Sequence, residues 1–205
     1  MPASNPAALE FLLSRRSRPA KTLQTPIPDA DDIQTILTAA ARTPDHGKLE
    51  PWRFIVLQRP ALLRLGDLVA VRGAALGLDT DQIEKAKTSY KTAHLAIAVI
   101  EVPKPSEKIP ALEQTYSAGA VCLALLNAAL ASGWGANWLS GWASHDPVFM
   151  SQGLGLTGNE RIAGIIHLGT ETSAPPERPR PDEMPLRHGF LNDISKLLEG
   201  FRPNR

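Results

Sequence analysis

The triplet Arg15-Arg16-Ser17 offers two guanidinium groups and a hydroxyl where the first helix is expected to end. A guanidinium binds a phosphate through two parallel hydrogen bonds, and a serine hydroxyl adds a neutral one. Basic residues at the C-terminus of a helix also complement the helix dipole and are commonly solvated. By itself, the triplet is therefore consistent both with a phosphate site and with an ordinary solvated helix end.

A second polar group lies in the loop where Arg42 and His46 bracket Thr43-Pro44-Asp45, shortly before Pro51-Trp52. Arg42 carries a charge that can reach an anionic group, and His46 can donate a hydrogen bond to a ligand or a substrate. A single histidine in a polar loop is more commonly a surface residue. This loop also leaves a binding role and a solvated role open.

A third segment, residues 133–142, combines glycines with three tryptophans, which are Trp134, Trp138 and Trp142. Tryptophans are frequent in cores and interfaces, so aromatic packing is one interpretation. The other is that Leu139-Ser140-Gly141 brings the backbone close to a ligand, because glycine permits a close approach. Late in the chain, Arg178-Pro179-Arg180 is either a solvated charge pair or a further anion contact.

Together and in this order, the segments resemble the nitroreductase family of flavin enzymes, and in particular its small, single-domain branch. The resemblance covers nearly the whole chain, from the N-terminal triplet through the Pro-Asp-His loop to the strand end at Ile166 to Thr170. It implies an FMN-binding site made of Arg15, Arg16, Ser17, Arg42, His46, Leu139, Ser140, Gly141 and Arg180.

Each of these segments has an implied role. The N-terminal triplet would hold the phosphate end of FMN, near which many members also place a basic element such as Arg180. Arg42 and His46 would touch the flavin, a contact that in this branch can cross the dimer interface. Family relatives carry a basic residue where Leu139 stands, so only its backbone has an implied role along the isoalloxazine ring. The stretch Ala129 to Trp134 corresponds to the place where the nicotinamide cofactor is received.

The implied activity is a ping-pong reaction in which NAD(P)H delivers a hydride to the flavin N5 and leaves. A nitroaromatic, a quinone or a similar electrophile then binds in the same place and is reduced. Because the flavin carries the redox chemistry, no residue of the chain is expected to act as a catalytic acid or base. The implied partners are a second copy of the chain, in a homodimer with FMN near the subunit interface, and a small-molecule electron acceptor.

Other functions remain open at this point. The same scaffold supports reductive dehalogenation or oxidative flavin chemistry, although this short chain leaves little room for extra lid segments. A flavin-binding protein of regulatory or storage type would hold FMN without NAD(P)H turnover. A plain interaction module would hold no flavin, and only the proline-rich tail around Arg178 favours it.

Composition narrows these classes. The chain has 205 residues, 43% of them hydrophobic, and a net charge of +1, which argues against nucleic-acid binding through a basic surface. One cysteine, Cys122, fits a reducing compartment, and a cytoplasmic protein without membrane spans is expected. The five histidines lack metal-ligand spacing, and no Gly-x-Gly-x-x-Gly follows a strand, so neither a metal site nor a Rossmann site is expected.

The pattern of apolar residues predicts the elements that must position these segments. Helices are expected from Pro6 to the triplet and at 29–42, 60–78, 81–92, 111–132 and 146–154, with a last one at Leu191 to Leu198. Strands are expected at 53–57, 93–102 and 161–168, with a strand or extended loop at 134–140. The stretch 118–131 is apolar nearly all round, which indicates a central helix or one buried by a partner subunit.

The expected fold class is therefore α+β, with one three-layer domain over residues 1–205 and a proline-rich C-terminal extension from about 171. The resemblance sharpens this to a dimeric α/β/α sandwich in which helices flank a central, mainly antiparallel sheet.

Overall fold

The computed structural model describes residues 3–179. These residues belong to two units, a compact one that ends at Pro175 and a second that begins at Pro176. Arg180 and the helix expected at Leu191 to Leu198 lie outside the described residues.

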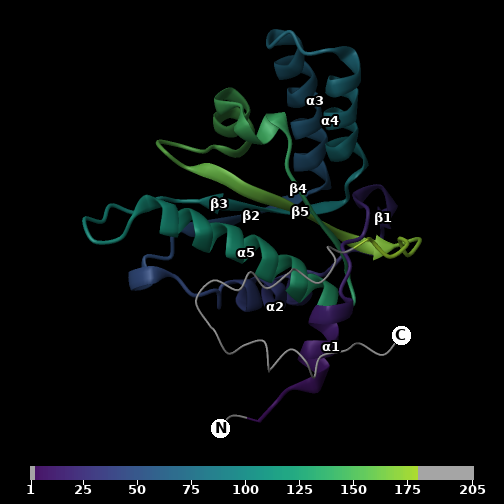
Figure 1. The fold of residues 1–205 in the computed structure, drawn as a ribbon. Coiled ribbons are helices and arrows are strands. Elements are labelled where there is room, and N and C mark those ends of the chain that lie inside the picture. Colours follow the sequence, from purple (N-terminus) through teal and green to yellow (C-terminus); the bar gives the residue numbers. More distant parts are fainter. Residues whose placement is uncertain (1–2, 180–205) are drawn as a thin grey trace. The chain divides into compact units, whose positions relative to one another are not determined.

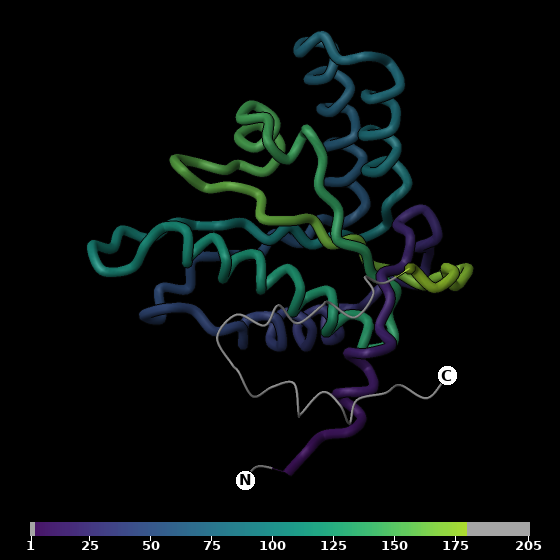
Figure 2. The backbone as a smooth tube through the Cα atoms, viewed as in Figure 1, coloured from purple at the N-terminus to yellow at the C-terminus, as the bar shows by residue number. Residues whose placement is uncertain are grey.

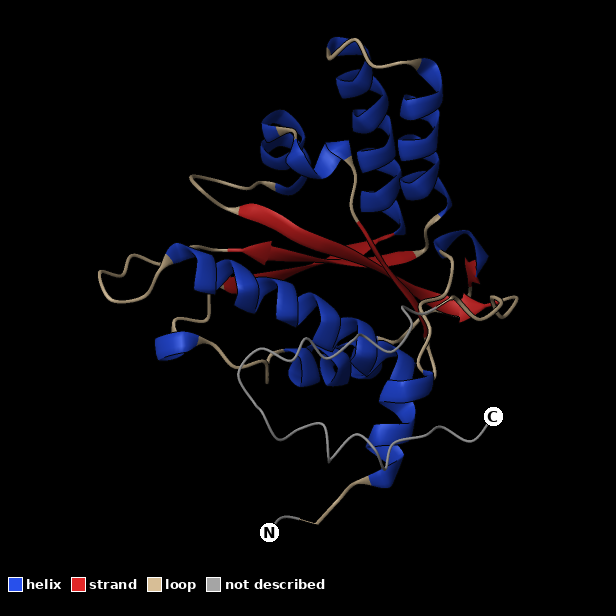
Figure 3. Cartoon of the chain, in the orientation of Figure 1, coloured by secondary structure: helices blue, strands red, loops and turns tan. Residues whose placement is uncertain are grey.

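An antiparallel sheet forms the centre of the first unit (Figure 3). Its strands are β1 (Leu23–Gln24), β2 (Trp52–Gln58), β3 (Leu95–Glu101), β4 (Gly135–Leu139) and β5 (Arg161–Glu171). β5 pairs with β1, β3 and β4, and β2 pairs with β3. All these pairings are antiparallel, which confirms the expected sheet.

Helices cover both faces of this sheet (Figure 1). α3 (Arg59–Ala75) and α4 (Thr80–Thr92) lie on one face, and α2 (Ala30–Ala40) and α5 (Ala111–Ala131) lie on the other. β3 shows why both faces must be covered, because all seven of its side chains are buried. Ala96, Ala98 and Ile100 join the core under α3 and α4, whereas Leu95, Ile97 and Val99 join the core under α5. The α/β/α arrangement is thus confirmed.

Local sequence signals set where several helices begin. α1 (Pro6–Ser14) has Asn5 as its N-cap, with the side chain accepting a hydrogen bond from the Ala8 backbone at 3.1 Å. α2 begins with a capping box between Asp29 and Asp32, and α4 begins after Asp79, which accepts from the Gln82 backbone. Pro60 occupies the first turn of α3, where its missing N–H costs no helical hydrogen bond.

α5 is both a core helix and an exposed one. Eight of its residues are buried, among them Val121, Cys122 and Leu125, so one face packs on the sheet. Burial raises the pKa of the Cys122 thiol to about 12, as expected for a structural cysteine. Of the described helices, α5 alone is long and apolar enough to cross a membrane. Its packing against the sheet accounts for that composition.

Several predicted boundaries were wrong by a few residues. The first helix ends at Ser14, with Arg15 as its C-cap, and the second ends at Ala40. The last strand runs three residues beyond the expected Leu168, to Glu171. Its last residues pair with β1, a two-residue strand between the first two helices, where no strand was predicted. The prediction missed this strand because its partner lies far away in sequence.

The segment between β4 and β5 also differs from the expected single helix. A short 3-10 helix, η3 (Trp142–His145), precedes a π-helical turn, η4 (Phe149–Gly153). Turns of this kind are rare and frequently lie near functional sites, and the pattern of apolar residues does not distinguish them from an α-helix.

Candidate functional site

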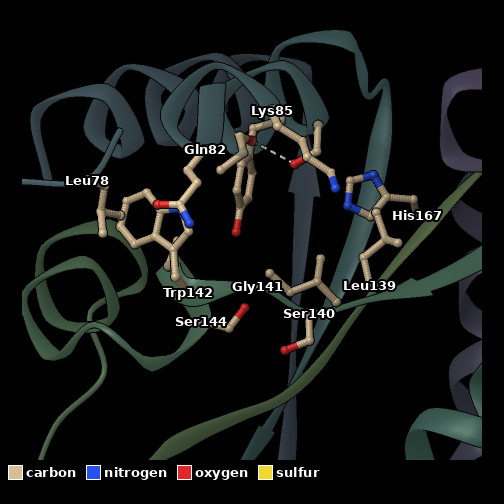
Figure 4. A pocket seen from close by; sticks show the side chains of 14 residues that line it. Leu78, Gln82, Lys85, Leu139, Ser140, Gly141, Trp142, Ser144 and His167 are labelled. Atoms are coloured by element: carbon tan, nitrogen blue, oxygen red, sulfur yellow. Dashed lines mark hydrogen bonds between the residues drawn. The ribbon is translucent and has the colours of Figure 1, made fainter. Parts of the chain in front are cut away.

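A cavity of about 410 Å³ lies between α4 and the turn that follows β4 (Figure 4). Leu139, Ser140 and Gly141, three of the residues expected beside the flavin ring, form one wall. Lys85 and Tyr90 of α4 and His167 of β5 contribute to the others. Most of the remaining lining is apolar, so the cavity suits a flat, largely apolar group.

The charged lining of this cavity, in the described part of the chain, is positive. Lys85 is the only residue with a permanent charge among the described residues that line it, and they include no aspartate or glutamate. His167 is buried, and burial lowers its pKa to about 4. Its imidazole is therefore neutral at neutral pH, and the cavity carries net positive charge that favours an electron-rich or anionic group.

A second pocket, of about 260 Å³, is lined by Arg15 and Arg16 of the N-terminal triplet, whereas Ser17 is not among its described lining residues. Arg15, Arg16 and Arg18 line it together with one carboxylate, Glu171, which pairs with the Arg18 Nε at 2.9 Å. The Arg15 Nη2 donates to the Ser17 Oγ at 3.0 Å. Among the described lining residues, three guanidiniums stand beside one carboxylate, and guanidiniums are the donors that suit a phosphate group.

β4 connects the two pockets. The Arg18 backbone N–H donates to the Ala136 carbonyl at 2.8 Å, and the Asn137 side chain donates to the Arg18 carbonyl at 2.6 Å. The triplet is thereby fixed beside the start of β4. Gly135 lines the arginine pocket and Leu139 lines the apolar cavity, about 13 Å apart along an extended strand.

The site's donor set fits FMN, whose phosphate and ring need a cationic and an apolar environment respectively. The backbone at Gly141 is also accessible, because no heavy atom of the described residues outside 140–142 lies within 4 Å of the position that a Cβ would take there. A ring can thus approach the main chain at the end of β4.

Arg42 and His46 do not join these pockets within one chain. The His46 Nδ1 lies 2.6 Å from the Glu113 Oε2, in the first turn of α5. Leu130, at the other end of α5, lines the arginine pocket. Glu113 and Leu130 are about 25 Å apart along a straight helix. Figure 2 shows that the loop that follows α2 and the N-terminal segment lie apart from each other.

The turn that carries Ser140 and Gly141 is supported by an ion pair from the neighbouring layer. Arg72 of α3 donates to Asp146 through Nε at 2.7 Å and through Nη2 at 3.1 Å. Asp146 also accepts from the Phe149 backbone at 2.9 Å. The Arg72 hydrogen bond holds the pKa of Asp146 below its usual value, so the carboxylate stays charged and keeps this turn in place.

Sequence reasoning missed the contributions of α4 and His167 to the apolar cavity, and it missed the contact between Glu113 and His46. Gln82, Lys85 and Ser89 follow helical spacing and line the cavity from one face of α4. That polar face resembles an ordinary solvated surface in the sequence. A histidine inside the apolar run Ile165 to Leu168 was a usable signal, because a polar residue in a buried strand needs a reason to be there.

Comparison with known proteins agrees with the resemblance found in the sequence. The model of the Nitroreductase family matches residues 12–170. The chain is 36% identical over 163 residues to the "Putative NAD(P)H nitroreductase YdjA" of Escherichia coli K12, covering 80% of this chain and 87% of that protein. It is 33% identical over 165 residues to the "Putative NAD(P)H nitroreductase" of Haemophilus influenzae, covering 80% and 88%.

Solved structures share the fold. A nitroreductase-like family protein from Bacillus cereus superposes with a TM-score of 0.70 at 24% identity, covering 88% of this chain and 93% of that one. A nitroreductase with bound FMN from Bacteroides fragilis superposes with a TM-score of 0.69 at 22% identity, covering 88% and 97%.

Proposed function

Because the chain belongs to the nitroreductase family, we propose that it is an FMN-dependent oxidoreductase that uses NAD(P)H. The observation that carries this proposal is the pair of pockets at the two ends of β4, one cationic and one apolar. FMN-bound relatives of the same fold support the choice of cofactor.

In this proposal Arg15, Arg16 and Ser17 hold the phosphate, while the backbone of Leu139, Ser140 and Gly141 lies along the ring. Lys85 favours added negative charge in the apolar cavity. Bound FMN supplies hydride-transfer chemistry, and the chain binds it, orients it and excludes water. NAD(P)H and a nitroaromatic, quinone or similar acceptor occupy the space above the ring in turn. Arg180 is a further proposed phosphate contact.

The active form is a homodimer in which Arg42 and His46 complete the site of the other subunit. Two facts support this assembly. The expected ligand residues lie at opposite ends of α5 in one chain. In addition, α5 exposes Leu112, Tyr116 and Leu123, which helical spacing places on one side of the helix. The single reduced cysteine fits a cytoplasmic location.

The first experiment is the visible spectrum of the purified protein before and after anaerobic addition of NADPH or NADH. We expect a flavin spectrum that bleaches, followed by reoxidation with a quinone, a nitroarene or a halophenol as the test of acceptor class. A flavin that neither nucleotide bleaches would point instead to a flavin-binding protein without turnover. Absence of flavin after reconstitution with FMN would contradict the proposal.

A further inference from the structure

His46 makes a short contact with an acidic residue outside the sequence motif that contains it. Its Nδ1 lies 2.6 Å from the Glu113 Oε2, below the usual 2.9–3.0 Å of an N–H···O hydrogen bond. The two residues are 67 positions apart in sequence. Their side chains are 62% and 45% exposed in the single chain, so the contact contributes little to stability by itself.

The loop around His46 is also held against the second turn of α5 and against the segment that precedes this helix. The Ser117 hydroxyl donates to the Pro44 carbonyl at 3.4 Å. Gly47 has a φ of +76°, and a Cβ there would collide with the Ile109 side chain, so the loop backbone fits closely at this position. The loop that carries His46 is therefore held in place by these contacts as well as by Glu113.

This contact fixes which nitrogen of the imidazole faces outward. A carboxylate can only accept a hydrogen bond, so Nδ1 must carry the hydrogen that Glu113 receives. In the neutral ring, the lone pair is then on Nε2, on the opposite side of the imidazole. An exposed acceptor held in this way suits a hydroxyl donor, and the ribityl chain of FMN is rich in hydroxyl groups.

We propose that Glu113 is a positioning residue that orients His46 so that Nε2 accepts a hydrogen bond from a ribityl hydroxyl of FMN held by the other subunit. This inference rests on the proposed function, because it assumes a shared FMN site. It adds a residue from the start of α5 to a site otherwise built from the loop, the triplet and the end of β4.

A double-mutant cycle on FMN affinity tests the proposal. The dissociation constant of FMN is measured on apoprotein by flavin fluorescence at a fixed pH of about 8.5. We expect His46→Ala to weaken binding about tenfold and Glu113→Ala about fivefold, as for the loss of one hydrogen bond and of its support. The double variant should bind no more weakly than His46→Ala, because Glu113 acts only through His46.

Two further variants serve as controls for the cycle. Glu113→Gln keeps an acceptor oxygen and should recover most of the affinity that Glu113→Ala loses. Glu84→Ala, which removes an exposed glutamate from a Lys87 ion pair on α4, should leave FMN affinity unchanged. If Glu113→Ala binds FMN like the wild type, or if its loss adds in full to that of His46→Ala, the positioning role is wrong.

Nitrogen-15 NMR of labelled histidine gives a readout that does not depend on FMN. In the wild-type apoprotein we expect His46 to carry its hydrogen on Nδ1, and in Glu113→Ala to shift toward the Nε2–H form. An unchanged tautomer in Glu113→Ala would overturn the inference. Failure of the wild type to bind FMN would instead contradict the proposed function, so the two failures are distinguishable.

Discussion

At the scale of single residues, His167 is the least expected member of the site. It lies in the middle of β5, opposite Ala96 of β3 and Asn137 of β4, and is only 4% exposed. The chain thus keeps a titratable group in its core, next to the cavity proposed for the ring. Because a buried charge is costly, this histidine must stay neutral for the fold to remain stable.

His167 should make stability depend on pH in mildly acidic solution. Its pKa falls from 6.5 in the unfolded chain to about 4 in the folded one, so between these values the unfolded state binds more protons. The contribution of neutral His167 to the free energy of unfolding is then fully present above about pH 6.5. It decreases by about 3 kcal/mol as the pH falls toward 4.

Urea unfolding of the protein across this range, at fixed protein concentration, measures the effect. His167→Gln should show a smaller loss of stability between pH 6.5 and 4 than the wild type. His94→Gln, which changes a partly exposed histidine, should follow the wild-type curve. Equal slopes for wild type and His167→Gln would mean that His167 is not the residue responsible.

At the scale of elements, α5 has two apolar faces with different partners. Its inner face packs on the sheet through residues such as Val121 and Leu125. Its outer face exposes Leu112, Tyr116 and Leu123 in the single chain. An exposed apolar stripe on the longest described helix is the surface that a second copy is proposed to cover.

Leu123→Glu should therefore break the proposed dimer. A glutamate buried at this surface would lose its hydration without gaining a partner, so the dissociation constant of the dimer should rise at least about a hundredfold. Sedimentation or light scattering should detect a monomer at micromolar concentration, with FMN affinity reduced in parallel. Leu76→Glu is a matched control, because Leu76 is 48% and Leu123 is 46% exposed. A Leu123→Glu protein that stays dimeric would place the interface elsewhere.

At the scale of the whole molecule, the proposed FMN site requires that two groups far apart in one chain become neighbours. The arginine pocket and the His46 loop are at opposite ends of α5. The proposed two-fold dimer would bring these groups together, since each subunit would contribute one end of α5 to each site. Every functional site would then contain residues of both subunits.

Subunit mixing tests this arrangement directly. Arg15→Ala should weaken FMN binding about tenfold or more through loss of a charge-assisted phosphate contact, and His46→Ala should also weaken it. In a heterodimer of the two variants, one site carries both changes and the other carries neither. Random mixing of the two unfolded variants should therefore restore about a quarter of the sites to wild-type affinity. No recovery would mean that both residues belong to a site within one subunit.

Much of the fold could be predicted from short-range patterns. The continuous apolar run of β3 indicated a strand buried on both faces, and spacing and caps located the main helices, because these signals lie within one element. The Arg-Arg-Ser triplet, the Pro-Asp-His loop and the Ser-Gly turn could be nominated as site segments through a family resemblance. β1 and the π-helical turn were missed, because long-range pairing and local packing decide them.

The residue patterns by themselves determined a three-layer α+β fold and the residue types suited to a phosphate and a ring, and the family resemblance added the class of protein and the central antiparallel sheet. Only the tertiary structure decided which of them meet. β4 holds Arg18 near one pocket and carries Gly141 toward the other, whereas α5 holds His46 apart from both. It also brought Lys85 and His167 to the apolar cavity, and Glu113 to His46, from elements without a binding motif. The physical reason is that proximity between distant segments depends on how helices and strands pack, which spacing within one segment does not encode.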